Sequence, residues 1–494
     1  MMAIEIGKRR EFIWDNYLVD ERKTTADRRV HEPIRREVSI TLDKPWEGDG
    51  CDFFCTVYDD IRRVYRMYYN GWEMMSPDRK THVAQHFDIC CLESEDGIHW
   101  ERPNLGLVEF DGSKDNNIII VASMYPGLTG LDNFFVMADT NPNPAVPGRF
   151  KAVMAYREKM ADGSHESKLM ALVSDDGYTF RLAGVVTKQG KFDSLNTVIW
   201  HEASHQYICY IRDFHEAGTW KDYESGDLNS LVRDIRVLFS SDFIHWTNPQ
   251  HLKFNDVEDF PLYTNCVSAY PGAEHILVGF PSRYVEKKEW TANFDHLCGA
   301  EKRRERCQSH PRYGQAVTDC LFMCSRDGIH WYRYDEAFMR PGPEFPANWV
   351  YGSCFPSVGL IPTPSAVPGA DDEWSFYIYD NHWLSIPAEM VRVSMRKDGF
   401  VSLHADREPK KIVTKSFTFE GSELKINFST SARGWLYLKV CADDGSAILS
   451  SCELFGDRIN RIVDLDGNLS ALAGKSVHLE IELKDADFYA FQFQ

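Results

Sequence analysis

The chain has 494 residues, and its 55 Lys and Arg against 74 Asp and Glu give a formal net charge of −19. This acidity disfavours nucleic acids and anionic membranes as partners. No run of 18 apolar residues occurs, and the amino terminus lacks the apolar core of a signal peptide, so we expect a cytoplasmic protein with no membrane partner. The thirteen Cys are scattered without a CxxC pair, so we expect reduced thiols, no metal and no cofactor.

Residues 1–45 predict an N-terminal strand and arm rather than a domain. They hold one alternating apolar segment, FIWDNYLVD, followed by the basic polar stretch RRVHEPIRRE. Alternation of this kind is typical of a half-buried strand. The arm is expected either to complete the last repeat of the following domain or to pack under the second domain.

A seven-residue phrase then returns at intervals along the chain. Its copies are SEDGIHW at 94–100, SDDGYTF at 174–180, SSDFIHW at 240–246, SRDGIHW at 325–331 and the degraded MRKDGFV at 395–401. Asp-Gly supplies the positive φ of a tight hairpin turn, and the Ser and Asp side chains can bond to turn backbone. The trailing Trp or Phe is expected to pack the hairpin onto its neighbours.

Each copy follows an apolar, strand-like run, and no helical pattern lies between the copies. A strand-rich repeat of this length is typical of a β-propeller with four strands per blade. Five copies therefore predict a five-bladed β-propeller over residues 46–406. From residue 407 the phrase is gone, and short alternating segments such as ELKINFS and SVHLEIEL predict a C-terminal β-sandwich over 407–494. The fold class is all-β.

A five-fold propeller followed by a β-sandwich resembles the clan of furanosidase-type glycoside hydrolases, which includes invertase-like and arabinanase-like enzymes, and mannoside phosphorylases share the propeller. The stretches LFMCSRDGIHWYRYDEAFMRPGPE, PWEGDGCDFF and ADFYAFQF resemble proteins described as similar to the N-terminal domain of glycosyl hydrolase family 32. The resemblance implies a glycosidase with its site in the propeller funnel. The invertase motif WMNDPNG is absent, so site residues are assigned here by position.

Acidic residues precede the expected inner strands of four blades: Asp52, Asp132, Asp193, and Glu258 with Asp259. Glycoside hydrolysis uses two carboxyl groups on opposite sides of the sugar. We assign Asp52 as base or nucleophile, because the clan that the chain resembles places that group on the first inner strand. Asp193 is assigned as the orienting carboxylate and Glu258 as the general acid. Glu344, on a loop before blade five, competes for the last role.

Further residues near the expected funnel are candidates for substrate binding. Tyr263, Trp349 and Tyr351 either stack on a sugar ring or belong to the propeller core. Arg212 and Arg283, at the ends of middle strands, either reach hydroxyl or carboxylate groups of a substrate or are solvated surface residues, and the surface position is the more common one for arginine. The complete set of substrate-binding candidates is Asp132, Tyr263, Arg283, Trp349, Tyr351 and His382.

Two other segments stand out. HEASH at 201–205 matches the HExxH pattern of zinc peptidases, but its flanks NTVIW and QYICYIR are strand-like, and the zinc chemistry needs a helix. We therefore expect no metal there. The charged segment 283–312 is a long insertion in blade four, expected to be a lid, an oligomer contact in a homo-oligomer, or a solvated loop.

Three functions remain open from the sequence. The first is a glycoside hydrolase acting on a small sugar or oligosaccharide, such as a fructoside or arabinoside. The second is a glycoside phosphorylase, which needs a cationic phosphate pocket; Arg283 and the basic insertion are its candidates. The third is a propeller that binds carbohydrate without catalysis.

Overall fold

The computed structural model describes the chain except for residues 1–2, 74–86, 126, 224–229 and 385. Its packing divides the chain into two compact units. One consists of Pro33–Thr363 with Ser375–Ser394, and the other of Met1–Glu32, Pro364–Trp374 and Met395–Gln494. Among the described residues, no helix combines the length and apolarity that crossing a bilayer requires.

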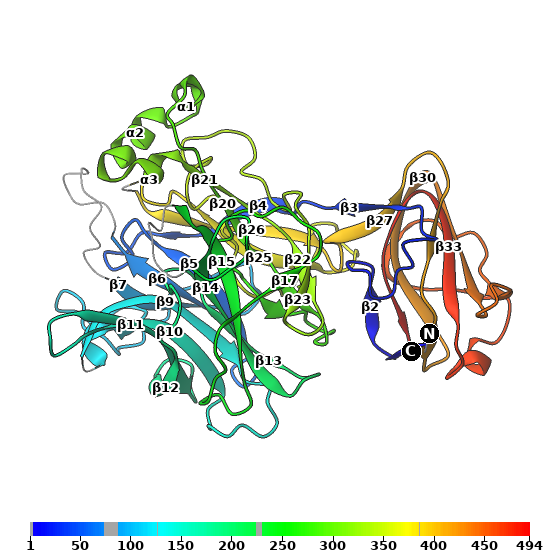
Figure 1. Cartoon of the computed structure of the whole chain (residues 1–494), viewed down its shortest axis with the longest axis horizontal. Helices are drawn as coiled ribbons and strands as arrows, with labels where there is room; N and C mark the ends of the chain where they lie inside the picture. The colour runs from blue at the N-terminus through cyan, green and yellow to red at the C-terminus, as the bar shows by residue number, and fades with distance from the viewer. Residues whose placement is uncertain (1–2, 74–86, 126, 224–229, 385) are drawn as a thin grey trace. The chain divides into compact units, whose positions relative to one another are not determined.

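The larger unit is the predicted five-bladed β-propeller, and its blades follow chain order (Figure 1). The first blade contains β5 (Asp52–Asp59), β6 (Val64–Trp72), β7 (Phe87–Ser94) and β8 (Ile118–Val121). The second contains β9 (Leu128–Ala138), β10 (Phe150–Lys159), β11 (His165–Ser174) and β12 (Arg181–Thr187). The third contains β13 (Thr197–His201), β14 (Gln206–His215), β15 (Val232–Ser240) and β16 (Gln250–His251).

The last two blades depart from this simple order. The fourth contains β18 (Ser268–Ala269), β19 (Leu277–Gly279), β22 (Met323–Ser325), β23 (His330–Arg333) and β17 (Lys253–Phe254). The fifth contains β24 (Ile361–Thr363), β25 (Glu373–Asp380), β26 (Ala388–Arg396) and β4 (Ile34–Leu42). β4 comes from the segment expected to be an arm, and its antiparallel pairing with β26 supplies the outer strand of the last blade.

Two sets of hydrogen bonds join neighbouring blades, and both include bonds between the fifth blade and the first. Beside the inner strand β5, the backbone N–H of Thr56 donates to the Val358 carbonyl and that of Val358 to the Phe54 carbonyl, both at 2.9 Å. Further out, a tyrosine of one blade donates its hydroxyl to the turn of the next: Tyr68 to the carbonyl of Gly177, and Tyr377 to that of Gly97. The second of these joins the fifth blade to the first.

In the first four blades the recurring phrase forms the turn between the third and fourth strands, whereas the degraded copy at 395–401 leads from β26 into β27 (Val401–Ala405) of the smaller unit. In the first copy, Ser94 Oγ accepts a hydrogen bond from the N–H of Gly97, 2.9 Å, and Asp96 Oδ1 accepts from those of Ile98 and His99. The copies at 174–180, 240–246 and 325–331 repeat these bonds. The fourth position has a positive φ in every copy, even where it is Phe243, at 70°.

The aromatic residue that ends the phrase packs less uniformly than expected. Trp100 and Trp331 are buried, whereas Trp246 is half-buried. In that copy Phe243, which replaces the glycine, is itself fully buried and lies against Tyr207, with ring centroids 5.1 Å apart. The extra aromatic ring therefore takes over part of the packing that the tryptophan provides elsewhere.

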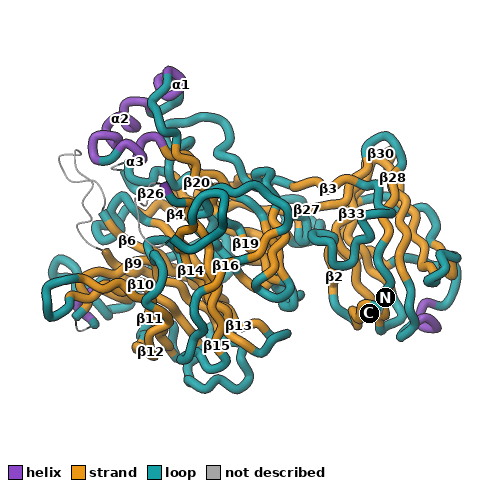
Figure 2. The backbone as a smooth tube through the Cα atoms, viewed as in Figure 1, coloured by secondary structure: helices purple, strands orange, loops and turns teal. Residues whose placement is uncertain are grey.

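The insertion in blade four carries most of the helical residues (Figure 2). It begins and ends with the hairpin of β20 (Ser282–Glu286) and β21 (Ala316–Cys320). Between them lie α1 (Ala292–His296), α2 (Ala300–Ser309) and α3 (Pro311–Gln315). Arg303 and Arg306 of α2 are buried, so part of the segment packs as a structured element rather than as a solvated loop.

The smaller unit is also built from strands. Its main sheet is organised on two long antiparallel strands, β30 (Leu424–Cys441) and β33 (His478–Phe493). The strands that join them in this sheet are β2 (Arg10–Phe12), β3 (Asp27–Val30), β27 (Val401–Ala405), β28 (Lys410–Val413), β31 (Ala447–Ser450) and β32 (Asp457–Ile462). β1 (Ile4–Gly7) pairs with β29 (Phe417–Phe419). The division of this unit into two sandwich layers stays a prediction.

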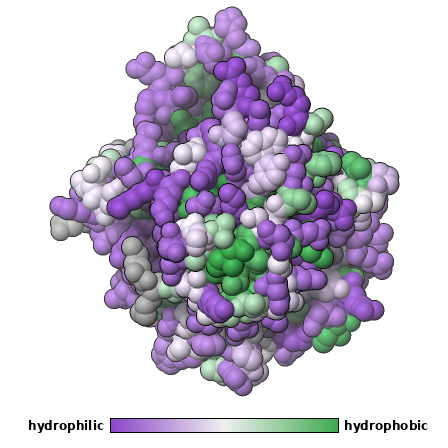
Figure 3. All heavy atoms as spheres, turned by 90° about the vertical axis from the view of Figure 1, so that its right-hand side faces the viewer, coloured by the Kyte–Doolittle hydropathy of each residue, from purple (hydrophilic) through white to green (hydrophobic). Residues whose placement is uncertain are grey.

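The face drawn in Figure 3 is mostly hydrophilic, in keeping with the polar composition. A hydrophobic patch lies near its centre, and further hydrophobic areas lie toward its right-hand edge.

Candidate active site

A cavity of about 310 Å³ in the propeller unit gathers residues from all five blades. Its lining residues are Asp52, Phe53, Trp72, Asp132, Asp193, Arg212, Phe214, Arg233, Tyr263, Tyr284, Arg312, Tyr313, Tyr351 and Trp383. Three of the acids expected at the inner strands are thus brought together with three arginines and an aromatic wall. A concave site of this composition is the usual form of a small-ligand site.

Asp52 enters the cavity through a distortion of the first inner strand. The register of β5 against β6 slips between Asp52 and Cys55, which marks a β-bulge, and Phe53 takes a positive φ of 53°. Asn70 Nδ2 of β6 donates to Asp52 Oδ1 at 3.0 Å. The residue is 2% exposed, and burial, followed by the charge of Asp132, raises the pKa of its carboxyl well above the ordinary value.

Asp132 in the second blade is placed by the same feature, a register slip in the inner strand with a positive φ at the following residue. The register of β9 against β10 slips beside it, and Asn133, the next residue, has a φ of 48°. The Asn133 amide donates to Asp132 Oδ1 at 2.5 Å. Burial, followed by the charge of Asp193, raises the pKa of Asp132 well above its ordinary value, against a lowering contribution from Arg212.

Asp193 differs from the other two acids in its surroundings. Its side chain is 63% exposed and forms an ion pair with Arg212, whose own side chain is only 6% exposed. Arg212 Nε also donates to the Lys191 carbonyl at 3.1 Å, which fixes the guanidinium at the cavity wall. The sequence had allowed either a substrate contact or a surface position for Arg212, and the structure places it in the cavity.

A short chain of hydroxyl groups runs along another wall. Tyr351 donates to the hydroxyl of Tyr263 at 2.9 Å, and Tyr263 donates to the backbone carbonyl of Asp193 at 2.7 Å. Burial raises the pKa of both tyrosines, so both stay protonated donors. Tyr263 and Tyr351 therefore lie in the cavity where the sequence placed them, but their rings are held by this chain.

Arg233 and Arg312 give the cavity a cationic side that the sequence did not indicate. In the part of the chain that the structure describes, the Arg233 guanidinium forms no hydrogen bond or ion pair, and it lies 4.0 Å from the ring centroid of Tyr284. Burial lowers the pKa of Arg233. Nε of Arg312 is also buried and has no hydrogen-bond partner among the residues that the structure describes. Both arginines come from segments distant in sequence, β15 and α3, and no local pattern marks them.

Glu258 is not among the residues that line this cavity, so its expected position beside Asp52 and Asp193 is wrong. Its side chain is exposed, its N–H donates to Asp335 Oδ2 at 2.8 Å, and its carbonyl accepts from Arg333. The positive-φ residues of the inner strands explain why the prediction for Glu258 was wrong, because each follows directly on the residue that enters the cavity in blades one and two. In blade four the positive φ falls at Cys266, so the position equivalent to Asp52 is the buried Asn265.

Four other candidates, Arg283, Trp349, His382 and Glu344, also lie outside the cavity lining. Arg283 is paired with Asp319, Nε to Oδ1 2.9 Å, and lines a separate cavity of about 980 Å³ together with Trp349. His382 is buried behind Trp383, with ring centroids 4.4 Å apart. The competing acid Glu344 is exposed and accepts a bond from the Cys298 N–H at 3.4 Å.

The HExxH match lies at the end of β13 and in the turn that leads to β14, as its strand-like flanks indicated. His201 ends β13 and is buried, with Nδ1 2.8 Å from Ser204 Oγ, whereas the side chain of His205 is 73% exposed. The two imidazoles therefore do not share the face of a helix.

Comparisons with known proteins give likeness only at the level of structure. No family model and no curated protein matches the chain. A Parabacteroides distasonis structure titled a putative glycoside hydrolase has 11% identity and a TM-score of 0.42, covering 74% of this chain and 97% of that one. The Bombyx mori GH32 β-fructofuranosidase BmSUC1 has 10% identity and a TM-score of 0.41, covering 94% of both chains.

A third similar structure carries a title on the GH130 family of mannoside phosphorylases, said to contain glycoside hydrolases that target β-1,2 mannosidic linkages in Candida mannan. It has 11% identity and a TM-score of 0.40, covering 75% of this chain and 96% of that one. TM-scores below 0.5 carry no argument about activity, so the function is argued from the cavity itself.

Proposed function

We propose that the chain is a carbohydrate-active enzyme, a glycosidase that cleaves a small sugar or oligosaccharide in the central cavity. The observation that carries this proposal is the pair Asp52 and Asp132, whose pKa values are raised by burial and by neighbouring charge inside an aromatic-walled cavity. Glycoside hydrolysis needs one protonated and one ionised carboxyl group, and the cation of Arg212 beside Asp132 is what distinguishes the two groups here.

Asp52 is assigned the role of general acid. It is the more deeply buried of the two, and the charge of Asp132 further favours its protonated form. A carboxyl that keeps its proton at neutral pH can protonate the oxygen of the departing group. This assignment replaces the expected pairing of Asp52 as nucleophile with Glu258 as acid, because Glu258 does not line the cavity.

Asp132 is assigned the role of base or nucleophile. The cation of Arg212 acts against the rise in its pKa, and the Asn133 amide hydrogen-bonds its Oδ1. Asp193 is held in its ion pair with Arg212, so it is assigned a positioning role at the cavity wall. Trp383 and Trp72 supply ring faces for sugar stacking.

The experiment compares Asp52→Asn and Asp132→Asn on two kinds of substrate. Aryl arabinosides and fructosides with acidic phenols need little protonation of the leaving group, whereas oligosaccharides need it fully. We expect Asp52→Asn to lose activity on oligosaccharides by a factor of about 10²–10⁴ and to lose much less on activated aryl glycosides. Asp132→Asn should lose activity on both.

Two results would contradict these roles. If Asp132→Asn spares the activated substrates and Asp52→Asn does not, Asp52 is the nucleophile or base instead. If the unmodified chain binds sugars by calorimetry but turns over none of a broad panel, the propeller is a carbohydrate-binding module. Glu258→Gln serves as the control and should keep full activity, because its side chain is exposed and outside the cavity lining.

Phosphorolysis is a second candidate, and the observation that favours it is the cationic side formed by Arg233 and Arg312. A guanidinium in a cavity wall that has no ion pair among the described residues is suited to hold phosphate oxygens. The test is product analysis with and without orthophosphate. A sugar 1-phosphate that forms only with phosphate, and is lost in Arg233→Met, would favour the phosphorylase; free sugar released equally in both conditions favours the hydrolase.

A further inference from the structure

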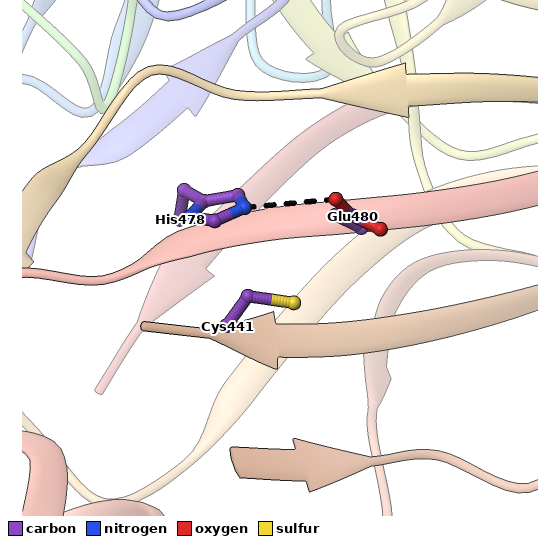
Figure 4. A group of neighbouring side chains, drawn as sticks. All are labelled: Cys441, His478 and Glu480. Carbon is purple, nitrogen blue, oxygen red and sulfur yellow. Dashed lines mark ion pairs between the residues drawn. The ribbon is translucent and has the colours of Figure 1, made fainter. Parts of the chain in front are cut away.

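Three side chains of types that can bind metal ions, Cys441, His478 and Glu480, lie close together in the smaller unit. His478 and Glu480 stand two residues apart at the start of β33, so their side chains point to the same face of the sheet. Cys441, the last residue of β30, is the Cα partner of His478 in the antiparallel ladder. Figure 4 shows the three side chains on two neighbouring strands.

The three potential ligand atoms all lie within 4.8 Å of one another. Tetrahedral zinc bonds of about 2.0–2.3 Å place ligand atoms roughly 3.3–3.8 Å apart. Side-chain rotations alone can bring the sulfur, nitrogen and oxygen to those distances, because the strands already hold the three Cα atoms in register.

The burial of Cys441 and His478 is unusual for their face of the sheet. Leu479 and Ile481, which alternate with His478 and Glu480, belong to the buried core. Cys441 and His478 lie on the other face of the sheet together with Lys439 and Glu482. There Lys439 and Glu482 are exposed, whereas Cys441 and His478 are only 1% and 5% exposed. The thiol and the imidazole are therefore buried although they lie on the face of the sheet that does not carry Leu479 and Ile481.

Neither the Cys441 thiol nor the His478 imidazole is held by a hydrogen bond to another described residue. Within the described part of the chain, the nearest acidic contact of His478 is Nε2 to Glu480 Oε1 at 3.7 Å. That separation is too long for a hydrogen bond but suits a shared ion between the two atoms.

The two carboxylate oxygens of Glu480 face different partners. Oε1 is turned toward His478, and Oε2 accepts from Lys411 Nζ at 3.4 Å. Lys411 therefore orients the carboxylate and leaves Oε1 available. An outer partner that fixes a ligating oxygen in this way is typical of protein metal sites.

We propose that Cys441, His478 and Glu480 form a binding site for a divalent transition-metal ion of the zinc class, with water as the fourth ligand. Sulfur, imidazole and carboxylate donors together match zinc, and three protein ligands leave one position open. On binding, Cys441 gives its thiol proton to solvent and the thiolate coordinates the ion. The ion would tie the end of β30 to the start of β33.

The test uses the full chain and cobalt(II), which occupies zinc sites and reports thiolate ligation by an ultraviolet charge-transfer band. We expect one equivalent of cobalt to produce the band and one equivalent of zinc to abolish it. The band should be absent from Cys441→Ser, and the tetrahedral visible bands should change in His478→Ala and Glu480→Gln.

Cys452→Ser is the matched control, since Cys452 is an exposed thiol of the same unit. It should keep the full band. Added zinc should raise the unfolding temperature of the unmodified chain and of Cys452→Ser but not that of Cys441→Ser or Glu480→Gln. If no band forms, or if it survives in Cys441→Ser and disappears in Cys452→Ser, the proposed site is refuted.

Discussion

Asn70 donates a hydrogen bond from Nδ2 to Oδ1 of Asp52, 3.0 Å, across the first two strands of the first blade. This bond and the bulge at Phe53 together orient a carboxyl that is 2% exposed toward the centre of the propeller. The amide donor favours the ionised form, whereas burial and the charge of Asp132 favour the protonated one, and the net effect is a raised pKa.

The first prediction concerns the pH dependence of stability. Because its pKa is raised in the folded protein, the stability that Asp52 contributes is fully present below its unfolded pKa of about 4 and is lost as the pH rises through the folded pKa. In Asp52→Asn this loss disappears. Urea unfolding at a series of pH values should therefore show a smaller drop in the free energy of unfolding from pH 4 to pH 7 than in the unmodified chain.

Asp464→Asn is the control for this measurement, because Asp464 is exposed. It should follow the unmodified chain at every pH. An Asp52→Asn curve that runs parallel to the unmodified one would mean that Asp52 is ionised in the folded protein.

The second prediction concerns Arg212. Its cation lowers the pKa of Asp132, so Arg212→Gln should raise that pKa further. If Asp132 must be ionised for turnover, the acidic limb of the kcat/KM profile moves to higher pH. Arg181→Gln, which replaces an exposed arginine bonded to the Pro147 carbonyl, should leave the limb in place. If the acidic limb of the kcat/KM profile stays at the same pH in Arg212→Gln, that limb reports the titration of a group other than Asp132.

The third prediction concerns the closure of the propeller. Tyr377→Phe removes the hydroxyl that donates to the Gly97 carbonyl between the fifth and first blades. Loss of a buried hydrogen bond that leaves its acceptor unpaired costs about 1–3 kcal/mol. Denaturant unfolding measures this cost. Tyr58→Phe, at a 45% exposed position, should change stability by less than about 0.5 kcal/mol; an equal effect of both variants would contradict the closing role.

The fourth prediction compares two glycines with similar backbone conformations. Gly163 has a φ of 86° with no atom within 4 Å of an added Cβ, so Gly163→Ala should cost only the left-handed strain, roughly 1–2 kcal/mol. Gly177 has a φ of 76°, and an added Cβ there would overlap Arg66 and approach Tyr68. Gly177→Ala should therefore cost at least about 1 kcal/mol more. If both variants lose the same free energy of unfolding, Arg66 and Tyr68 move aside at no cost and the predicted overlap at Gly177 is wrong.

The blade count was predictable because the evidence for it is local. A Ser, an Asp and a residue with positive φ form their turn from bonds within six residues, so each of the four complete copies of the phrase marks its own hairpin. The fold class and the repeat therefore followed from the sequence. The place of Asp52 and Asp132 at the inner strands was also predictable, since each stands directly before an apolar segment of the sequence.

What the sequence alone did not determine is which residues share the cavity. The position of Glu258 depended on how blade four aligns with the others, and the positive φ at Cys266 that sets this alignment has no marker in the residue types. Arg233 and Arg312 reach the cavity only because a strand of blade three and the short helix α3 of the blade-four insertion converge there. Turns form from neighbours in sequence, whereas a cavity forms from segments that only the closed ring brings together.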